Sequence, residues 1–463
     1  MSNKPDWSEF KPGTKSEWLI ELNKSLKSPI ASWLPDANIN LSPIYFRDEI
    51  GHNKAALAKA PFTRGNKYSG NDWAVMERIS ADSAIKLNQS ALAALNQGVD
   101  ALCIDVTNNQ PSDLAIILNQ VIASIIRIDL IVATNPELWL QELDKIAGET
   151  NSARGSIIFD PFRQFESELD ESQVQAGFHD WFELVKLSSG RSGKIRSAVV
   201  STIPAHNAGA GPSLELAIAL AKAHELLLFL LENGLSIDEA SALFEIRTGI
   251  GTSFFTEIAK FRALRPLWAK IIDAYQPVHD CSSNLFIHAE TAYWNMSAND
   301  VHTNLLRHTT EAMSAVYGGI DSLLILPFDM LQNGGTATAM RYSRNIQYLL
   351  KEESFASKVA DPAGGAMYIE EYTQQMCEAA WDLFLEFENA GGYTKAAVNG
   401  CINAKILECQ SGLNKDIMEH KKIWLGVNKY KSGKQSEAAL IPEQLSKLYP
   451  TLELEKLLNE KEG

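Results

Sequence analysis

The sequence has 463 residues, of which 45% are hydrophobic and 21% are charged, as is typical of an ordered globular protein. Its formal net charge of -15 would repel a phosphate backbone, so we expect no nucleic acid partner. The five cysteines form no Cys-x-x-C pair and no zinc-like spacing with histidine, which indicates reduced thiols and no metal site. The N-terminus lacks an apolar core and no apolar run could span a bilayer, so we expect a cytoplasmic protein without a membrane segment.

The first predicted element is an amphipathic helix in the sequence SEWLIELNKSLK, with Ser16 as its cap. A Pro-containing extended stretch follows it. We expect residues 1–50 to form an arm that covers another surface instead of building a core. The apolar side chains of the helix form one stripe: Trp18, Leu19, Leu22 and Leu26.

Between residues 51 and 330, short β-rich runs alternate with longer helical ones. The strands do not alternate apolar and polar residues, which indicates a parallel sheet covered by helices. Eight β-then-α units favour a closed (β/α)8 barrel of the TIM type, an α/β fold. The predicted strands are WAVMERI, ALCIDV, RIDLIVA, GSIIFDP, RSAVVST, ALFEIRTG, NLFIHAET and SLLILP. The predicted helices span residues 80–97, 113–124, 136–147, 213–233, 253–274 and 300–317.

Residues 331–463 are predicted to form a C-terminal helical extension, with helices at 336–352, 369–389 and 393–409. Active sites of such barrels lie at the carboxyl ends of the strands. No lysine stands there, which argues against an unrelated barrel lyase or aldolase. The strand-end segments are Asp105, Asp160–Arg163, Thr202–Gly211, Arg247–Thr252, His288–Trp294 and Leu324–Asp329.

Several segments resemble the methylmalonyl-CoA mutase family in their order and spacing, from about Trp18 to Cys409. They are SFFTEIAKFRALRPLWAKI, AGAGPSLELAIALA, TTEAMSAVYGGIDSL, MRYSRNIQYLLKEES and VADPAGGAMYIE. The resemblance implies a barrel that admits coenzyme A along its axis and an arm that wraps a partner subunit. It also implies adenosylcobalamin, held by a separate flavodoxin-like domain over the barrel mouth.

The hallmark of that cobalamin-binding domain is Asp-x-His-x-x-Gly. The nearest string in this chain runs from Asp300 to Leu305, and Leu305 stands in place of the glycine. We interpret Asp300 as a helix cap and His302 as part of a helical surface. The resemblance therefore implies that a partner subunit, and not this chain, binds adenosylcobalamin.

The mouth residues of the family's catalytic chains are altered here. Those chains have Gly-Tyr-His shortly before an Ala-Gly-Ala turn, whereas this chain has Pro204 there, which cannot donate a hydrogen bond. His206 lies two positions further along. The loop after Arg64 is shorter than in catalytic chains and retains Tyr68 as its tyrosine. His288 is retained, but the charged residue beside the corresponding histidine of the catalytic chains is absent here.

These losses favour a catalytically silent barrel, because each such donor typically contributes strongly to the reaction. If the barrel is active, its catalytic candidates are His206, His288 and Tyr68. The candidates for binding substrate or coenzyme A are Arg64, Asn207, Glu290 and Trp294. The residues expected at the subunit interface or in structural ties are Trp18, Leu22, Arg262, Arg265 and Trp268.

The resemblance thus predicts the small, non-catalytic subunit of a heterodimeric mutase that interconverts methylmalonyl-CoA and succinyl-CoA in propionate metabolism. A large catalytic subunit would be its partner. Two alternatives stay open: an active acyl-CoA mutase chain that works with a separate cobalamin-binding polypeptide, and an assembly subunit that binds coenzyme A without chemistry.

Overall fold

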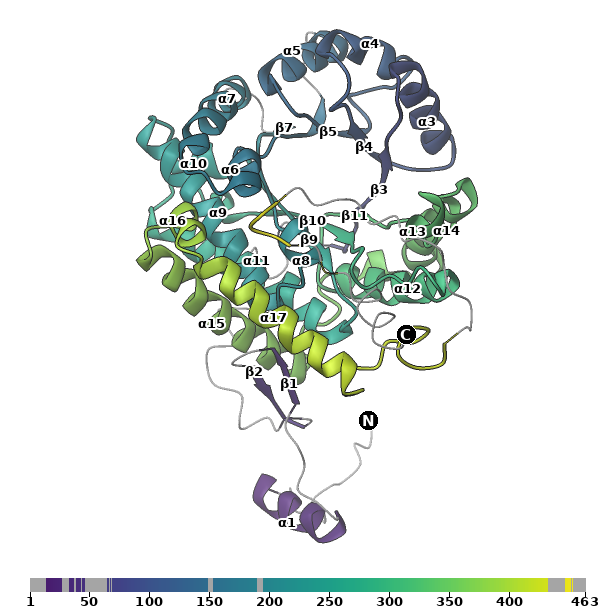
Figure 1. Cartoon of the computed structure of the whole chain (residues 1–463), viewed down its shortest axis with the longest axis vertical. Coiled ribbons are helices and arrows are strands. Elements are labelled where there is room, and N and C mark those ends of the chain that lie inside the picture. The colour runs from purple at the N-terminus through teal and green to yellow at the C-terminus, as the bar shows by residue number, and fades with distance from the viewer. Residues whose placement is uncertain are drawn as a thin grey trace, which may run out of the picture.

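A closed parallel barrel forms the centre of the computed structural model (Figure 1). The predicted α/β barrel is therefore confirmed. The structure describes residues 14–26, 33–36, 39–42, 44–45, 65, 67, 69–148, 153–189, 195–431, 446–450 and 452. The barrel strands are β3 (Ala74–Ile79), β4 (Ala101–Asp105), β5 (Arg127–Ile131), β6 (Arg154–Ile158), β7 (Ile195–Arg196), β8 (Ala198–Ser201), β9 (Phe244–Ile250), β10 (Phe286–Thr291) and β11 (Ser322–Leu324).

The fifth predicted strand is split at Ser197 into β7 and β8. Strand β7 pairs with β6 and β8 pairs with β9, so the two halves together close the ring. The Ser197 carbonyl accepts a hydrogen bond of 2.8 Å from the Trp181 indole. Counted together, β7 and β8 are one strand, so the ring has eight strands, as the sequence predicts.

Helices cover the outside of the barrel. Helices α9 (Pro212–Glu232) and α11 (Phe254–Ala274) are buried on nearly all sides because they lie between the barrel and α15 (Met367–Asn389). This explains why their sequences are apolar all round. The barrel helices are α3 (Ala84–Asn96), α4 (Leu114–Ile117), α5 (Pro136–Ala147), α6 (Arg163–Glu168), α7 (Ser172–Ser189), α8 (Ile203–Asn207), α9 (Pro212–Glu232), α10 (Ile237–Ser241), α11 (Phe254–Ala274) and α12 (Val301–Tyr317), with 3-10 turns η2 (Pro111–Asp113) and η3 (Asp280–Ser283). Beyond the barrel lie α13 (Met330–Asn333), α14 (Ala337–Tyr348), the π-helical turn η4 (Leu349–Glu353), the 3-10 turn η5 (Ala356–Lys358), α15 (Met367–Asn389), α16 (Tyr393–Val398) and α17 (Cys401–Met418).

Two predicted helices were wrong in extent. The one at 113–124 is only the short α4, because the Asn88 amide binds the carbonyls of Ile117 and Asn119 and the chain then turns at Gln120, whose φ is 66°. The one at 393–409 is two helices, α16 and α17, separated at Gly400, whose φ is 75°.

The N-terminal arm begins with α1 (Lys15–Ser25), which has no buried residue. Its cap is Thr14, and not Ser16 as predicted, because Thr14 and Glu17 form a reciprocal capping box. Strands β1 (Trp33–Asp36) and β2 (Ile39–Leu41) follow as an antiparallel pair. Ile39 and Leu41 are fully buried in the main core, so this part of the arm packs on its own chain, contrary to our expectation.

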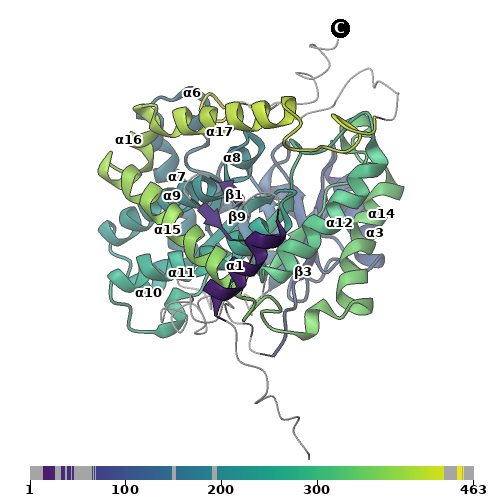
Figure 2. The ribbon, with the colours of Figure 1, turned by 90° about the horizontal axis from the view of Figure 1, so that it is seen from below.

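Helix α17 crosses the face of the barrel that carries α6 and α8 (Figure 2). That face is the barrel mouth, because α8 directly follows the carboxyl end of β8. Among the described helices, none has a stretch long and apolar enough to cross a membrane.

Candidate functional site

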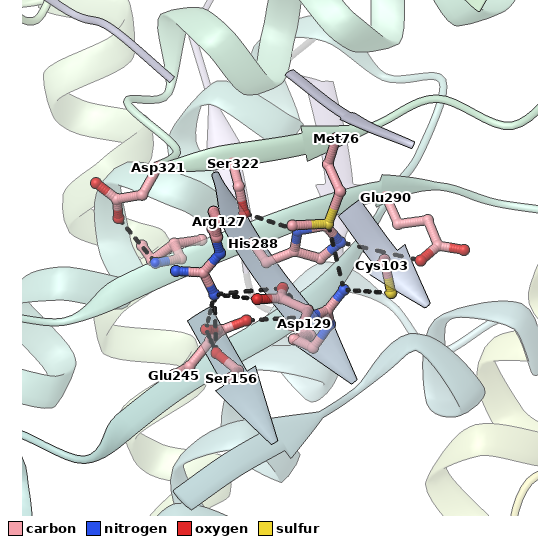
Figure 3. Close-up of polar contacts among 12 residues, drawn as sticks. Met76, Cys103, Arg127, Asp129, Ser156, Glu245, His288, Glu290, Asp321 and Ser322 are labelled. Carbon is pink, nitrogen blue, oxygen red and sulfur yellow. Dashed lines mark hydrogen bonds and ion pairs between the residues drawn. The ribbon is translucent and has the colours of Figure 1, made fainter. Parts of the chain in front are cut away.

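Charged side chains fill the interior of the barrel. We call six of them the barrel network: Arg78, Arg127, Asp129, Glu245, Arg247 and Glu290. All six come from strands, and their three guanidinium groups match three carboxyl groups. Figure 3 shows part of this cluster, with Arg127, Asp129 and Glu245 close together. Such buried charges persist only when they are paired.

Arg127 binds three side chains around it. Its guanidinium lies 2.6 Å from Glu245, 3.0 Å from Asp129 and 2.8 Å from the Ser156 hydroxyl. It also lies over the Phe286 ring, 4.1 Å from the centroid, and Arg196 stacks on the same ring at 4.3 Å. These groups close the barrel at the amino ends of the strands.

Arg247 spans the barrel. Its Nη1 lies 2.9 Å from Asp129 and 3.1 Å from Glu245, and its Nη2 lies 3.8 Å from the Cys103 sulfur. Strand β4, which carries Cys103, is opposite β9 in the ring. Arg247 therefore occupies the axis along which the family resemblance predicts coenzyme A.

The protonation states within the network follow from burial and pairing. Burial alone would raise the pKa of Glu245, but Arg127 and Arg247 outweigh it and hold this pKa at about 2. Arg78 likewise outweighs burial at Glu290 and lowers its pKa. Glu245 and Glu290 are therefore ionised at neutral pH.

His288 lies within this interior and not at the mouth. It is fully buried on β10, and its Nδ1 is 2.8 Å from the Ser322 hydroxyl. Burial, assisted by the nearby Arg247 charge, lowers its pKa to about 4, so the ring is neutral at neutral pH. Glu290, a candidate for binding coenzyme A, instead forms a 2.8 Å ion pair with Arg78.

His206 lies at the mouth, on α8. Its Nδ1 is 2.9 Å from Glu215, whose carboxylate also binds Lys260 at 2.9 Å. Lys260 and His206 outweigh the effect of burial and lower the pKa of Glu215. The His206 ring packs over Gly249, where a Cβ atom would come within 2.3 Å of it. His206 is thus fixed in a buried ion cluster.

Two further mouth candidates lie beside His206. The side-chain Oδ1 of Asn207 accepts a 2.9 Å hydrogen bond from the Tyr293 backbone N–H, so Asn207 holds the loop after β10. The Trp294 ring lies 6.2 Å from the His206 ring. The structure therefore brings His206, Asn207 and Trp294 together at the mouth, whereas the side chains of His288 and Glu290 are bound to Ser322 and Arg78.

The remaining candidates are scattered. Arg64 and Tyr68 lie outside the described residues. Arg262 pairs with Asp361 and Glu370, and Arg265 pairs with Asp321, all within this chain. Trp268 is fully buried against Phe244. Trp18 and Leu22 are half-buried on α1.

The string from Asp300 to Leu305 forms the start of α12. His302 is exposed on α12 and packs on the Phe328 ring, and Asp300 occupies the N-cap position, where it accepts a hydrogen bond from the Thr303 hydroxyl. No cluster of three metal-ligating side chains is found in the described part of the chain.

A family model described as methylmalonyl-CoA mutase matches residues 147–458. The methylmalonyl-CoA mutase small subunit of Porphyromonas gingivalis is 31% identical over 445 residues, which cover 92% of this chain and 71% of that relative. The chain belongs to the methylmalonyl-CoA mutase family. The small subunit of Streptomyces virginiae is 29% identical, over 91% of this chain and 71% of its own length. The mitochondrial mutase of Mus musculus is 37% identical over only 54% of this chain and 33% of its own length.

The sequence analysis missed the barrel network of this mutase-family chain. Although the predicted strands as a whole do not alternate, Arg127 and Asp129 stand two positions apart in one strand, and Glu245 and Arg247 do so in another. That spacing places each pair on one face of its strand, but it does not show that the faces converge on the barrel axis.

Proposed function

We propose that this chain is the small, non-catalytic subunit of a methylmalonyl-CoA mutase and supports a large catalytic subunit. The position of Arg247 carries this proposal. A coenzyme A chain along the axis would have to displace a buried guanidinium that is paired with two carboxylates and reaches the opposite wall. Breaking such a pairing is costly.

The neutral, buried His288 and the immobilised His206 support the same role. A donor to a substrate carbonyl must reach the substrate, and His288 lies within the filled interior. His206 is held by Glu215. In this proposal the partner subunit binds adenosylcobalamin and supplies the radical chemistry, while this chain contributes an interface.

The test is to isolate the tagged chain from its own cells and measure the native mass, the adenosylcobalamin-dependent turnover and the binding of succinyl-CoA. We expect a heterodimer that binds one succinyl-CoA, and we expect no turnover by the chain alone. Two succinyl-CoA molecules per heterodimer would overturn the proposal.

A second arm addresses the alternative of a separate cobalamin protein. The isolated chain is mixed with a small cobalamin-binding polypeptide and adenosylcobalamin. Turnover of (R)-methylmalonyl-CoA in this mixture would make the chain a catalyst and would direct attention to His206, His288 and Tyr68. We expect none.

A further inference from the structure

Two C-terminal segments cover the barrel mouth. The strap comprises residues 419–431, which follow α17, and the return segment comprises residues 446–450 and 452. Both join one apolar cluster, separate from the main core, that contains Trp294. Its buried members are Ile417, Trp424, Val427 and Leu452.

The strap is held on the loop that follows β10 and on α12. The Trp424 indole donates a hydrogen bond of 3.2 Å to the Asn295 carbonyl, and the Arg307 guanidinium binds the Leu425 carbonyl. The Lys422 ammonium lies over the Trp294 ring, 5.5 Å from its centroid. Burial lowers the pKa of Lys422, which is consistent with its position under this cover.

The return segment is held at α8, which follows β8, two strands along the rim from β10. The Gln410 amide on α17 bridges the carbonyls of Ala208, at 2.6 Å, and Pro450, at 3.1 Å. Leu452 packs so closely over Gly209 that a Cβ there would lie 2.8 Å from its methyl group. The strap and the return segment thus hold neighbouring parts of the rim, after β10 and after β8, on either side of β9.

A stack of side chains runs down from the strap. Lys422 covers Trp294, Trp294 lies beside His206, and His206 binds Glu215. His206 is 4% exposed, and its Nε2 has no hydrogen-bond partner among the described residues. Because Nδ1 faces the Glu215 carboxylate, Nε2 is the atom that a reagent would meet once the cover opens.

We propose that the strap and the return segment form a lid that closes the barrel mouth over His206, independently of the barrel network beneath it. The interior and the mouth are then two separate barriers to a ligand. This inference does not depend on the proposed function, because its readout is the accessibility of one histidine and not turnover.

The test is the acylation of histidines by diethylpyrocarbonate in the full chain, followed site by site by mass spectrometry. Exposed His179 and His279 serve as internal references. In the wild type we expect His206 to react at least about tenfold more slowly than the references, since it must wait for local opening. Equal rates would overturn the lid.

Variants on the strap test whether the lid is the cause of the slow reaction of His206. Trp424→Ala should raise the His206 rate toward that of the references, whereas Ile423→Ala, at an adjacent 45% exposed side chain, should leave it unchanged. Gln410→Ala removes the contact of the return segment with Ala208 and should also accelerate the reaction of His206. This second variant covers the case in which Trp424→Ala fails to fold. Unchanged His206 rates in folded Trp424→Ala or Gln410→Ala would contradict the proposal.

Discussion

Glu311 is a buried carboxyl group that makes the stability of the fold depend on pH. It is 1% exposed on α12 and accepts a 2.8 Å hydrogen bond from Asn295. Burial is the largest influence and raises its pKa to about 8, so the carboxyl group is neutral at neutral pH. Folding therefore favours the protonated form of this side chain.

The sign of the effect on stability follows directly. Below the ordinary pKa of a glutamate, the carboxyl group is protonated in both the folded and the unfolded state and costs no stability. As the pH rises above that value toward the folded pKa of about 8, the unfolded state ionises first and the free energy of unfolding falls. We predict that Glu311→Gln removes this loss. Between pH 6 and pH 9 the wild type should lose about 3 kcal/mol of unfolding free energy relative to the variant. Urea unfolding at each pH measures it, and parallel curves would refute the assignment.

Arg247 gives the second prediction at this scale. Arg247→Leu leaves Asp129 and Glu245 without one of their partners, so we expect a loss of about 3–5 kcal/mol in unfolding free energy. Arg154→Leu, at an exposed arginine on β6, is the matched control and should change stability by less than about 0.5 kcal/mol. Similar losses in both variants would mean that the barrel network is not the cause.

At the scale of elements, the pairing of β5 with β6 depends on one glycine. Gly155 has a φ of 146°, and a Cβ there would lie 1.7 Å from the Ile128 carbonyl oxygen. The backbone of β5 occupies the space that a side chain would need. No rearrangement of flexible side chains can relieve this contact.

We therefore predict that Gly155→Ala prevents the chain from folding or lowers its melting temperature far more than Gly148→Ala does. Gly148 also has a positive φ, of 76°, but nothing lies within 4 Å of its missing Cβ. That control measures the cost of a positive φ without a steric contact, which is about 1–3 kcal/mol. Equal thermal shifts by circular dichroism would show that the strand contact is unimportant.

The elements were largely predictable, since each strand is a short apolar run between helical segments. Helix α7 was missed although Val174, Phe178, Trp181 and Val185 recur at helical spacing and are all buried. The strap was not predictable, because Trp424 has no periodic apolar neighbours that would indicate burial. Its position depends on contacts with Asn295 and Arg307, which are distant in the sequence.

For the candidate site the limits are similar. Sequence similarity marked His206 and His288 as equivalent candidates, but one lies at the mouth and the other within the barrel network. Which of two strand-associated histidines is reachable depends on the direction of each side chain and on what fills the axis. The residues around each histidine in the sequence determine neither its side-chain direction nor what fills the axis.

At the scale of the whole molecule, α1 is separate from the core that the rest of the chain forms. None of its residues is buried, while Trp18 and Leu22 share one stripe. Burial of that stripe against the partner would stabilise the complex without affecting this chain's own fold.

We predict that a Trp18→Ala and Leu22→Ala double variant lowers the affinity for the large subunit at least about tenfold while its own melting temperature stays within a degree or so. Ile20→Ala, at a 56% exposed residue on the opposite face of α1, is the control. Sedimentation of the mixed subunits gives the affinity. A double variant that binds like the wild type would place the interface elsewhere.

The pairing of the first barrel strand with the last has a consequence for how the chain folds. Ala74 on β3 is in register with Ser322 on β11, and its backbone N–H donates a hydrogen bond to the Asp321 carbonyl, so the ring cannot close until most of the chain has been synthesised. Until then both strand edges are open, and non-local pairing of this kind is slow and prone to aggregation. Recombinant production of this chain should therefore benefit from slower expression and from chaperones.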